Sequence, residues 1–399
     1  MFADCAVAMN RRRFLATTGM SLLSGCLSTE KVLRGTEPTT QNIPDKNRIV
    51  EPSWLKQYGS AGTPTMLLDV IRHTNEGYIA VGHNNFQPWI LKVGFGGEVQ
   101  WSRTIDDREW EVTLNSITSA SDGGYAICGT LYPTNDTTPI GGVLLRVDKK
   151  GRLLWHQVYE PELGKFDYRR FSSIVETTDG NYVCVGQYLF KNKYNDRISW
   201  VVWADSKGKP IWQRLYGNSV IVKTAIEDGP GVIIGGRSFQ GSLSPEGAFI
   251  DRITEAGLDW RIILGESNII NDISEIGDNK YIAVGDFDTA SASGPMVLRL
   301  DSSGDVLSKS VYLDEESFPL KSITSSSDKF HTIGISDDSG IWLMELDPNL
   351  KLRDASIINI SIDDISSAFS FVSVENTPGS GVIIAAPGDP HGRLVSLNR

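Results

Sequence analysis

The side chains that most often do chemistry are scattered along this chain. Its five histidines show no metal-ligand spacing: His73, His83, His156, His331 and His391. An Asp-x-x-Gly pattern recurs at Asp148, Asp205 and Asp301, where turn formation explains the aspartate better than ligation does. The sequence has no Gly-x-Ser-x-Gly elbow and no phosphate-binding glycine loop. It therefore predicts no catalytic residue and no metal site.

Recognition chemistry is concentrated in three segments between predicted strands. Residues 106–110, 161–171 and 188–197 combine aromatic side chains with arginine and aspartate. Tyrosine, tryptophan and arginine are enriched in binding hot spots, and loops on a rigid scaffold often carry function. We therefore predict a rim that binds a protein or a glycan, formed by Trp110, Phe166, Tyr168, Arg169, Arg170, Tyr188, Phe190, Tyr194 and Asp196. The alternative is that these loops only cover the scaffold.

The elements that position these loops come from an internal repeat. A turn followed by an apolar strand, as in Gly123-Gly124-Tyr125-Ala126-Ile127-Cys128-Gly129, occurs seven times. Copies are about fifty residues apart, a spacing typical of propeller blades. The seven copies are residues 76–82, 123–129, 180–186, 230–236, 279–285, 328–334 and 380–386.

A second unit follows most copies: an apolar strand, an Asp-x-x-Gly turn and a strand with a tryptophan, as in residues 143–155. Runs of this kind bounded by turn residues predict hairpins. Each repeat is thus expected to form four antiparallel strands, A to D from the axis outward. Its A–B and C–D turns would open on one face, and its B–C and D–A loops on the other.

The two ends of the repeat region complement each other. The seventh repeat stops without a fourth strand, while residues 54–59 match the D-strand endings of the other repeats. The N-terminal strand should therefore complete the last blade and remove the open sheet edges. The prediction is an all-β, seven-bladed β-propeller of four-stranded antiparallel blades over residues 48–399.

Several recurring residues are predicted to be structural. The aligned tryptophans should hold neighbouring blades at a fixed distance: Trp54, Trp101, Trp155, Trp212 and Trp260. Ser308 and Arg353 replace them in blades 5 and 6, where looser packing is expected. The repeated glycines should allow close backbone approach near the axis. Cys128 and Cys184 are read as two buried thiols, with a disulfide as the alternative.

The segment Arg146-Val147-Asp148-Lys149-Lys150-Gly151-Arg152-Leu153-Leu154-Trp155 resembles the end of a PQQ-type repeat. Residues 48–399 as a whole are similar to secreted prokaryotic propellers of the quinoprotein-like superfamily. That resemblance implies the fold and leaves activity open, since members include enzymes and non-catalytic assembly or binding proteins. It implies eight blades and a Glu, Asn and Asp calcium site for true PQQ dehydrogenases. The sequence has seven repeats and no such constellation, so no PQQ or calcium cofactor is predicted.

The first residues form a leader. Arg11, Arg12 and Arg13 precede Phe-Leu and a short apolar stretch that ends in Leu23-Ser24-Gly25-Cys26. The arginine run resembles a twin-arginine export signal, and the last four residues resemble a lipobox, a combination typical of haloarchaeal lipoproteins. Residues 1–26 are thus expected to be the signal, with Cys26 lipidated on the outer face of the cytoplasmic membrane. Residues 27–47 are expected to be a flexible tether. An ordinary cleaved signal is the alternative.

The overall charge limits the classes of partner that the protein can bind. A net charge of −11 and a pI near 5.1 exclude a basic surface of the kind that binds nucleic acid. The sequence thus predicts a monomeric, non-catalytic extracytoplasmic scaffold that binds a protein or glycan on its B–C/D–A face. The alternative function is a secreted enzyme, either a quinoprotein-like oxidoreductase or a polysaccharide hydrolase or lyase.

Overall fold

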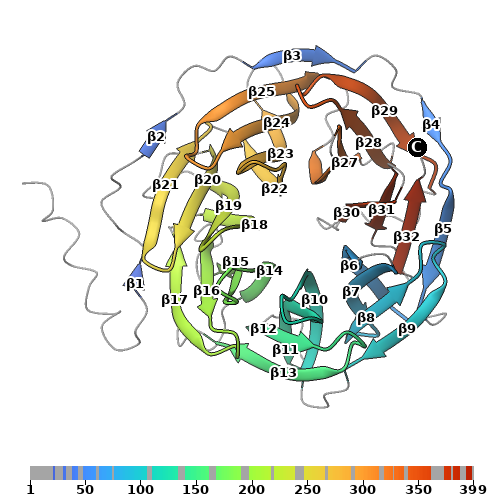
Figure 1. Ribbon diagram of the computed structural model, residues 1–399, viewed down its shortest axis with the longest axis vertical. Coiled ribbons are helices and arrows are strands. Elements are labelled where there is room, and N and C mark those ends of the chain that lie inside the picture. Colours follow the sequence, from blue (N-terminus) through green and yellow to red (C-terminus); the bar gives the residue numbers. More distant parts are fainter. Residues whose placement is uncertain are drawn as a thin grey trace, which may run out of the picture.

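Seven β-sheets stand around a central axis in the computed structural model (Figure 1). Together they confirm the predicted seven-bladed β-propeller with four-stranded antiparallel blades. The structure describes residues 21–22, 30–32, 38–43, 48–59, 63–73, 76–105, 110–133, 140–160, 168–189, 197–216, 220–238, 247–265, 268–288, 293–313, 319–326, 328–336, 340–360, 373–378, 381–386 and 392–397.

Each blade is a meander whose first strand lies nearest the axis (Figure 1). Blade 1 comprises β6 (Thr65–His73), β7 (Gly77–Asn84), β8 (Gln87–Val93) and β9 (Val99–Thr104). Blade 2 comprises β10 (Trp110–Ser119), β11 (Tyr125–Pro133), β12 (Gly141–Val147) and β13 (Leu153–Tyr159). Blade 3 comprises β14 (Tyr168–Glu176), β15 (Tyr182–Leu189), β16 (Arg197–Ala204) and β17 (Pro210–Tyr216). Blade 4 comprises β18 (Val220–Asp228), β19 (Gly231–Ser238), β20 (Gly247–Thr254) and β21 (Gly257–Ile263). Blade 5 comprises β22 (Ile269–Glu275), β23 (Lys280–Asp288), β24 (Ser293–Asp301) and β25 (Val306–Leu313). Blade 6 comprises β26 (Leu320–Ser325), β27 (Phe330–Ser336), β28 (Gly340–Leu346) and β29 (Leu352–Ile358).

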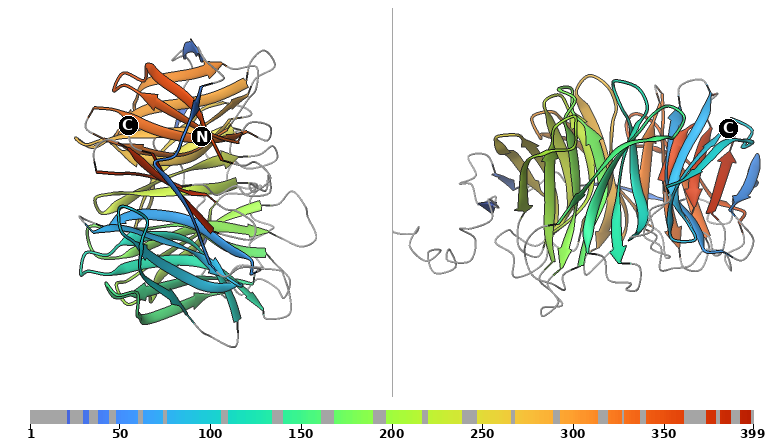
Figure 2. Two further views of the ribbon diagram at one scale, coloured as in Figure 1. Left: turned by 90° about the vertical axis from the view of Figure 1, so that its right-hand side faces the viewer. Right: turned by 90° about the horizontal axis from the view of Figure 1, so that it is seen from below.

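Blade 7 is closed by the N-terminal part of the chain, as predicted. Its strands β30 (Ser373–Asn376), β31 (Val382–Ala386) and β32 (Gly392–Leu397) are followed in the sheet by β5 (Trp54–Tyr58). Strand β5 pairs antiparallel with β32, in a register that sets Trp54 opposite Ser396 and Tyr58 opposite Gly392. The first and last parts of the propeller therefore share one sheet. We call the face of the A–B and C–D turns the turn face, and the opposite one the loop face; Figure 2 shows both from the side.

The segment before β5 runs around the outside of the ring (Figure 1). Each of its short strands pairs in parallel with the outer strand of one blade, from blade 3 to blade 6. These strands are β1 (Ser21–Leu22), β2 (Glu30–Val32), β3 (Thr39–Asn42) and β4 (Ile49–Val50). We call them the strap. Within the range expected to be a flexible tether, β3 is thus paired with β25, and Ile43 is buried.

A β-bulge at the same place in the inner strands explains the repeated glycine. The register of β6, β14, β18 and β22 shifts by one residue opposite Gly82, Gly186, Gly236 and Gly285. A Cβ atom on any of these glycines would lie within 2 Å of the carbonyl oxygen of the inner-strand residue just before the one that pairs with the glycine, for example 1.9 Å from that of Met66 at Gly82. The predicted close approach near the axis is therefore confirmed, and the bulge is its cause.

The tryptophan column joins neighbouring blades, also as predicted. The indole rings of Trp54, Trp101, Trp155 and Trp260 each lie against the C–D turn glycine of the next blade: Gly97, Gly151, Gly208 and Gly304. All four glycines have positive φ. A Cβ atom there would come within 3 Å of the ring, so only glycine fits both the backbone and the contact.

The joint between blades 5 and 6 corrects one expectation. Ser308 stands in the tryptophan position of blade 5, and looser packing was expected there. Leu350 replaces the turn glycine of blade 6, has a φ of 64° and is 0% exposed. It belongs to a core cluster with Tyr312 and Trp342, and its carbonyl oxygen accepts a hydrogen bond from the Tyr312 hydroxyl. Apolar volume missing from one blade is thus supplied by the next.

The predicted buried thiols are also confirmed. Cys128 and Cys184 are free, buried and neighbours between blades 2 and 3. Burial raises the pKa of the Cys128 thiol, so it stays protonated. Among the described residues, no helix is long and apolar enough to cross a membrane.

Candidate binding sites

The predicted rim falls largely outside the described residues. This holds for Phe166, Phe190, Tyr194 and Asp196, as it does for Arg11, Arg12, Arg13 and Cys26 of the leader. Trp110 and Tyr168 are the first residues of β10 and β14, at the loop face. Arg170 follows on β14 and is partly buried.

Two rim residues are buried, which corrects their prediction as contact residues. Tyr188 is 0% exposed and packs in the core cluster between blades 2 and 3. Arg169 is 7% exposed, lies 5.5 Å from the Tyr188 ring and donates to the carbonyl oxygen of Ile140 at 2.9 Å. Every residue of β15 from Tyr182 to Tyr188 is buried, and the sequence pattern alone did not reveal that the side chains of Tyr188 and Arg169 pack against a neighbouring blade. They stabilise the joint between two blades.

Seven polar side chains surround the axis at one level: six follow the bulge of their inner strand, and the seventh, Ser373, is the first residue of β30. They form what we call the axial ring: Asp69, Ser116, Ser173, Thr224, Asp272, Ser322 and Ser373. The ring residues hydrogen-bond to neighbouring blades. The Asp69 carboxylate accepts from the Ile117 N–H at 2.9 Å and from the Ser373 hydroxyl at 2.7 Å. The Ser322 hydroxyl likewise accepts from the Val374 N–H at 3.3 Å.

Asp272 is the most heavily bonded member of the axial ring. Its carboxylate accepts from the N–H groups of Ile273 and Ile323 and from the hydroxyls of Thr224 and Ser322, at 2.8 to 3.1 Å. Four bonds fill the acceptor positions of a carboxylate. Burial raises the pKa of Asp272 to about 6 despite these bonds. Such a carboxylate does not fit a calcium ligand, and no group of three or more His, Cys, Asp or Glu side chains suited to a metal occurs in the described part of the chain.

Charges differ between the two ends of the axis. Toward the turn face, burial raises the pKa of Glu375 to about 7, with Asp69 and Asp272 adding to the effect. Burial also raises the pKa of Glu227, and the nearby Glu275 and Glu176 raise it further. Toward the loop face, Lys321 and Lys223 lie near Asp286, whose pKa burial raises to about 6. The turn-face end is thus rich in carboxylates, while lysines gather at the loop-face end.

A pocket of about 520 Å³ opens on the turn face between blades 4 and 5. Its walls come from the A–B turns of both blades, the outer strands of blade 4 and the C–D turn of blade 5. The lining residues are Asp228, Gly229, Pro230, Arg252, Asp259, Trp260, Asn279, Ser302 and Ser303. Sequence reasoning expected function on the opposite face and missed this pocket.

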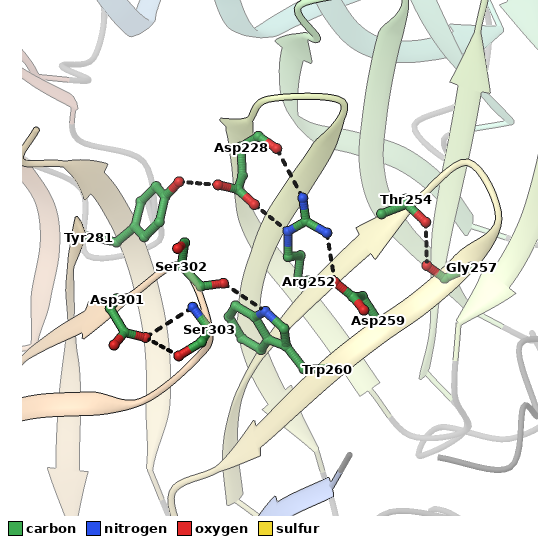
Figure 3. A network of polar contacts seen from close by, with 10 residues as sticks. All are labelled: Asp228, Arg252, Thr254, Gly257, Asp259, Trp260, Tyr281, Asp301, Ser302 and Ser303. Carbon is green, nitrogen blue, oxygen red and sulfur yellow. Dashed lines mark hydrogen bonds and ion pairs between the residues drawn. The ribbon is translucent and has the colours of Figure 1, made fainter. Parts of the chain in front are cut away.

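Arg252 is at the centre of the polar network beside this pocket (Figure 3). Its guanidinium donates to the carboxylates of Asp228 and Asp259 on its two sides. Asp228 also accepts from the Tyr281 hydroxyl of blade 5. Burial lowers the pKa of Arg252, but the charge-assisted bonds together outweigh it and raise the pKa, so Arg252 stays charged. The Trp260 indole N–H donates to the Ser302 carbonyl oxygen at 3.0 Å, and this bond holds the Trp260 side of the pocket against the C–D turn of blade 5.

Short turns in blade 4 explain why the pocket lies here. In blades 2, 3 and 5 the A–B and C–D turns span 120–124, 148–152, 177–181, 205–209, 276–280 and 301–305. In blade 4, Asp228 pairs with Gly231 and Thr254 pairs with Gly257, so only 229–230 and 255–256 protrude. The turns of blade 4 therefore protrude less from this face than the turns of blade 5 do. The signal available in the sequence was Gly229-Pro230-Gly231, which departs from the Asp-Gly turns of other repeats.

Comparisons with known proteins agree with the fold. No family model and no curated protein sequence matches the chain. Among solved structures, virginiamycin B lyase from Staphylococcus aureus with quinupristin has a TM-score of 0.55 at 12% identity, over 86% of this chain and 99% of that one. Drosophila semaphorin 2a has a TM-score of 0.54 at 8% identity, over 90% and 76%. Puromycin hydrolase has a TM-score of 0.51 at 12% identity, over 85% and 52%. These likenesses show the fold alone.

Proposed function

We propose that this chain is an exported lipoprotein whose propeller is a non-catalytic scaffold that binds a protein or glycan on its loop face. The contrast between the two faces is the observation that carries the proposal. Turns on the turn face are short and bonded internally, as where Asp148 and Asp205 each accept from two backbone N–H groups of their own turn. Connections on the loop face range in length from 85–86 to 359–372. Variable loops on a rigid ring are where binding function concentrates.

The strap supports a close association with the membrane. Glu30 pairs with Arg261 on the outer strand of blade 4, and Cys26 precedes Glu30 by four residues (30 − 26 = 4). Four residues span at most about 14 Å. A lipid on Cys26 would therefore hold the outer edge of blade 4 next to the bilayer, with both faces of the ring accessible from the side. This arrangement differs from the long flexible tether expected from sequence.

The second candidate function is a secreted enzyme, either a quinoprotein-like oxidoreductase or a polysaccharide hydrolase or lyase. The pocket between blades 4 and 5 favours it, because two carboxylates and an arginine line one cavity. Two of the similar structures are a lyase and a hydrolase by title. Arg252 already pairs with both carboxylates, however, which suits a binding wall better than an acid and base pair.

The first test is mass spectrometry of the protein from its native membranes, with metal and cofactor analysis of the same sample. A lipid on Cys26, and release of the Cys26→Ser variant from the membrane, would support the anchor. An unmodified Cys26 in a soluble mature protein would contradict it. A stoichiometric quinone or calcium ion would favour the enzyme over the scaffold.

Photo-crosslinking then tests the loop face. A photoreactive residue in place of Tyr194 should capture a defined protein or glycan, whereas the same residue in place of Lys207, exposed in a C–D turn of the turn face, should not. Equal capture at both positions would contradict a binding site on the loop face.

A further inference from the structure

The pocket between blades 4 and 5 lies on the turn face, away from the predicted rim, and its lining has a consistent chemistry. Polar and apolar surface contribute about equally to it, and the polar part comes from Asp228, Asp259, Arg252, Asn279, Ser302 and Ser303. Pro230 and the edge of Trp260 are the apolar contribution. Its volume of about 520 Å³ is within the range of small-molecule sites.

The charged groups in the pocket are fixed before any ligand arrives. Arg252 bonds to Asp228 and Asp259, and Asp228 also bonds to Tyr281 of the next blade (Figure 3). Asp228 is therefore tied to both walls, and a ligand would not need to order it. Asp259 is the more open group, since its side chain is 52% exposed. Preorganised donors and acceptors lower the entropic cost of binding.

The balance of charge determines which ligands suit this pocket. Arg252 offsets one of the two lining aspartates, and Lys280 lies 3.9 Å from Asp278 in the next turn, whereas Glu227 and Glu275 stand on adjoining strands of the same face. An anionic ligand would meet net negative charge there. A neutral molecule with several hydroxyl groups meets carboxylate and amide acceptors together with guanidinium, amide and hydroxyl donors. Its C–H surfaces can contact Pro230 and the Trp260 edge.

We propose that this pocket is a binding site for a neutral saccharide. The site depends on the short turns of blade 4, since longer turns like those of its neighbours would protrude into the same space. It is independent of the proposed binding function on the loop face, because the two surfaces lie at opposite ends of the strands.

The test is a glycan-array screen of the full chain with neutral oligosaccharides, followed by calorimetric titration of the best of them. Asn279→Gly removes the amide but suits the positive φ of 53° at this position, so it should weaken binding about tenfold, the effect of one lost hydrogen bond of good geometry. Ser302→Trp should abolish binding by filling the pocket, with an unchanged melting temperature because Ser302 is exposed. The matched control is Ser206→Ala, at the corresponding turn position of blade 3, which should bind as the parent protein does.

Two further probes separate ligand classes. Asp259→Asn keeps a hydrogen-bonding side chain and removes a charge, so it should leave the affinity for a neutral saccharide within about threefold. Spermidine and a polyuronate are the charged probes, and neither should bind in this pocket. The proposal is overturned if no neutral saccharide binds, if Ser302→Trp binds as well as the parent, or if only spermidine binds and Asp259→Asn removes that binding.

Discussion

The ring is held together in two different ways, by the axial ring on the inside and by the strap with β5 on the outside. Near the axis, short hydroxyl and carboxylate side chains bond directly to the next blade, as Asp69 does to Ile117. On the outside, backbone pairing and tryptophan packing hold the ring together, as at β5 and Trp54. Inner contacts suit crowded strands, whereas outer contacts must bridge blades that diverge with distance from the axis.

The largest effect is expected at blade 7, where β32 and β5 come from opposite ends of the propeller sequence and are joined only by strand pairing. Trp54→Ala removes the indole that packs on Gly97 and donates to the Phe95 carbonyl oxygen. We expect a loss of about 4 kcal/mol in the free energy of unfolding, measured by urea denaturation. Amides of β5 and β32 should also exchange early. Trp101→Ala is the matched control in blade 1, whose four strands follow one another along the chain, and equally early exchange of β8 and β9 in that variant would contradict a special weakness of blade 7.

Asp272 tests the inner contacts. Asp272→Ala leaves two backbone N–H groups and two hydroxyls without their acceptor, and we expect it to cost about 3 kcal/mol in denaturant titration at neutral pH. Ser173→Ala removes a single ring bond, to the Ala225 N–H, and should cost about 1 kcal/mol. Equal costs in the two variants would show that the axial ring is not built around its carboxylates.

The pH dependence of stability at Glu375 provides a further test of the contacts near the axis. Burial raises its pKa to about 7 from an ordinary 4.5, with Asp69 and Asp272 raising it and Arg72 lowering it. A raised pKa means that the folded protein holds this proton more tightly than the unfolded chain does. The stabilisation is complete below about pH 4.5 and is lost as the pH rises through 7. Glu375→Gln should be more stable than the parent by about 3 kcal/mol at pH 8 and equal to it at pH 4. A pH-independent difference would contradict this account.

The smallest effect is expected in the strap. The Gln41 side chain on β3 donates to the Leu350 carbonyl oxygen at 2.8 Å and accepts from the Leu352 N–H at 3.0 Å, so it connects blade 5 to blade 6. Gln41→Ala should lower the unfolding free energy by about 1 kcal/mol, measured by the urea midpoint. The control is Asn42→Ala, at the exposed residue next to Gln41, which should leave the urea midpoint unchanged. An unchanged midpoint in Gln41→Ala would indicate that β3 does not stabilise the ring.

Much of the architecture was predictable because it repeats. Seven repeated strands, six of them ending in glycine, a tryptophan column and complementary chain ends were enough to place the blades and the closing strand. Each of these features is local or periodic, and turn chemistry and strand alternation can be read without knowledge of distant contacts.

The candidate sites were less predictable, because burial depends on the partner blade. Tyr188 and Arg169 look like contact residues by type, yet they lie between blades 2 and 3. Leu350 stands at a turn position that favours glycine, and only the missing tryptophan at Ser308 explains it. The pocket beside Arg252 likewise needs two short turns of blade 4 next to the longer turns of blade 5.

The sequence by itself determined the number of blades, the strand order and the closure of the ring, because hydrogen-bonding periodicity and turn residues act over a few neighbouring positions. Only the tertiary structure decided which polar side chains meet at the axis, which aromatic residues are buried and where a cavity opens. Those outcomes depend on contacts between residues about fifty positions apart, such as Asp228 with Tyr281, which no local pattern specifies.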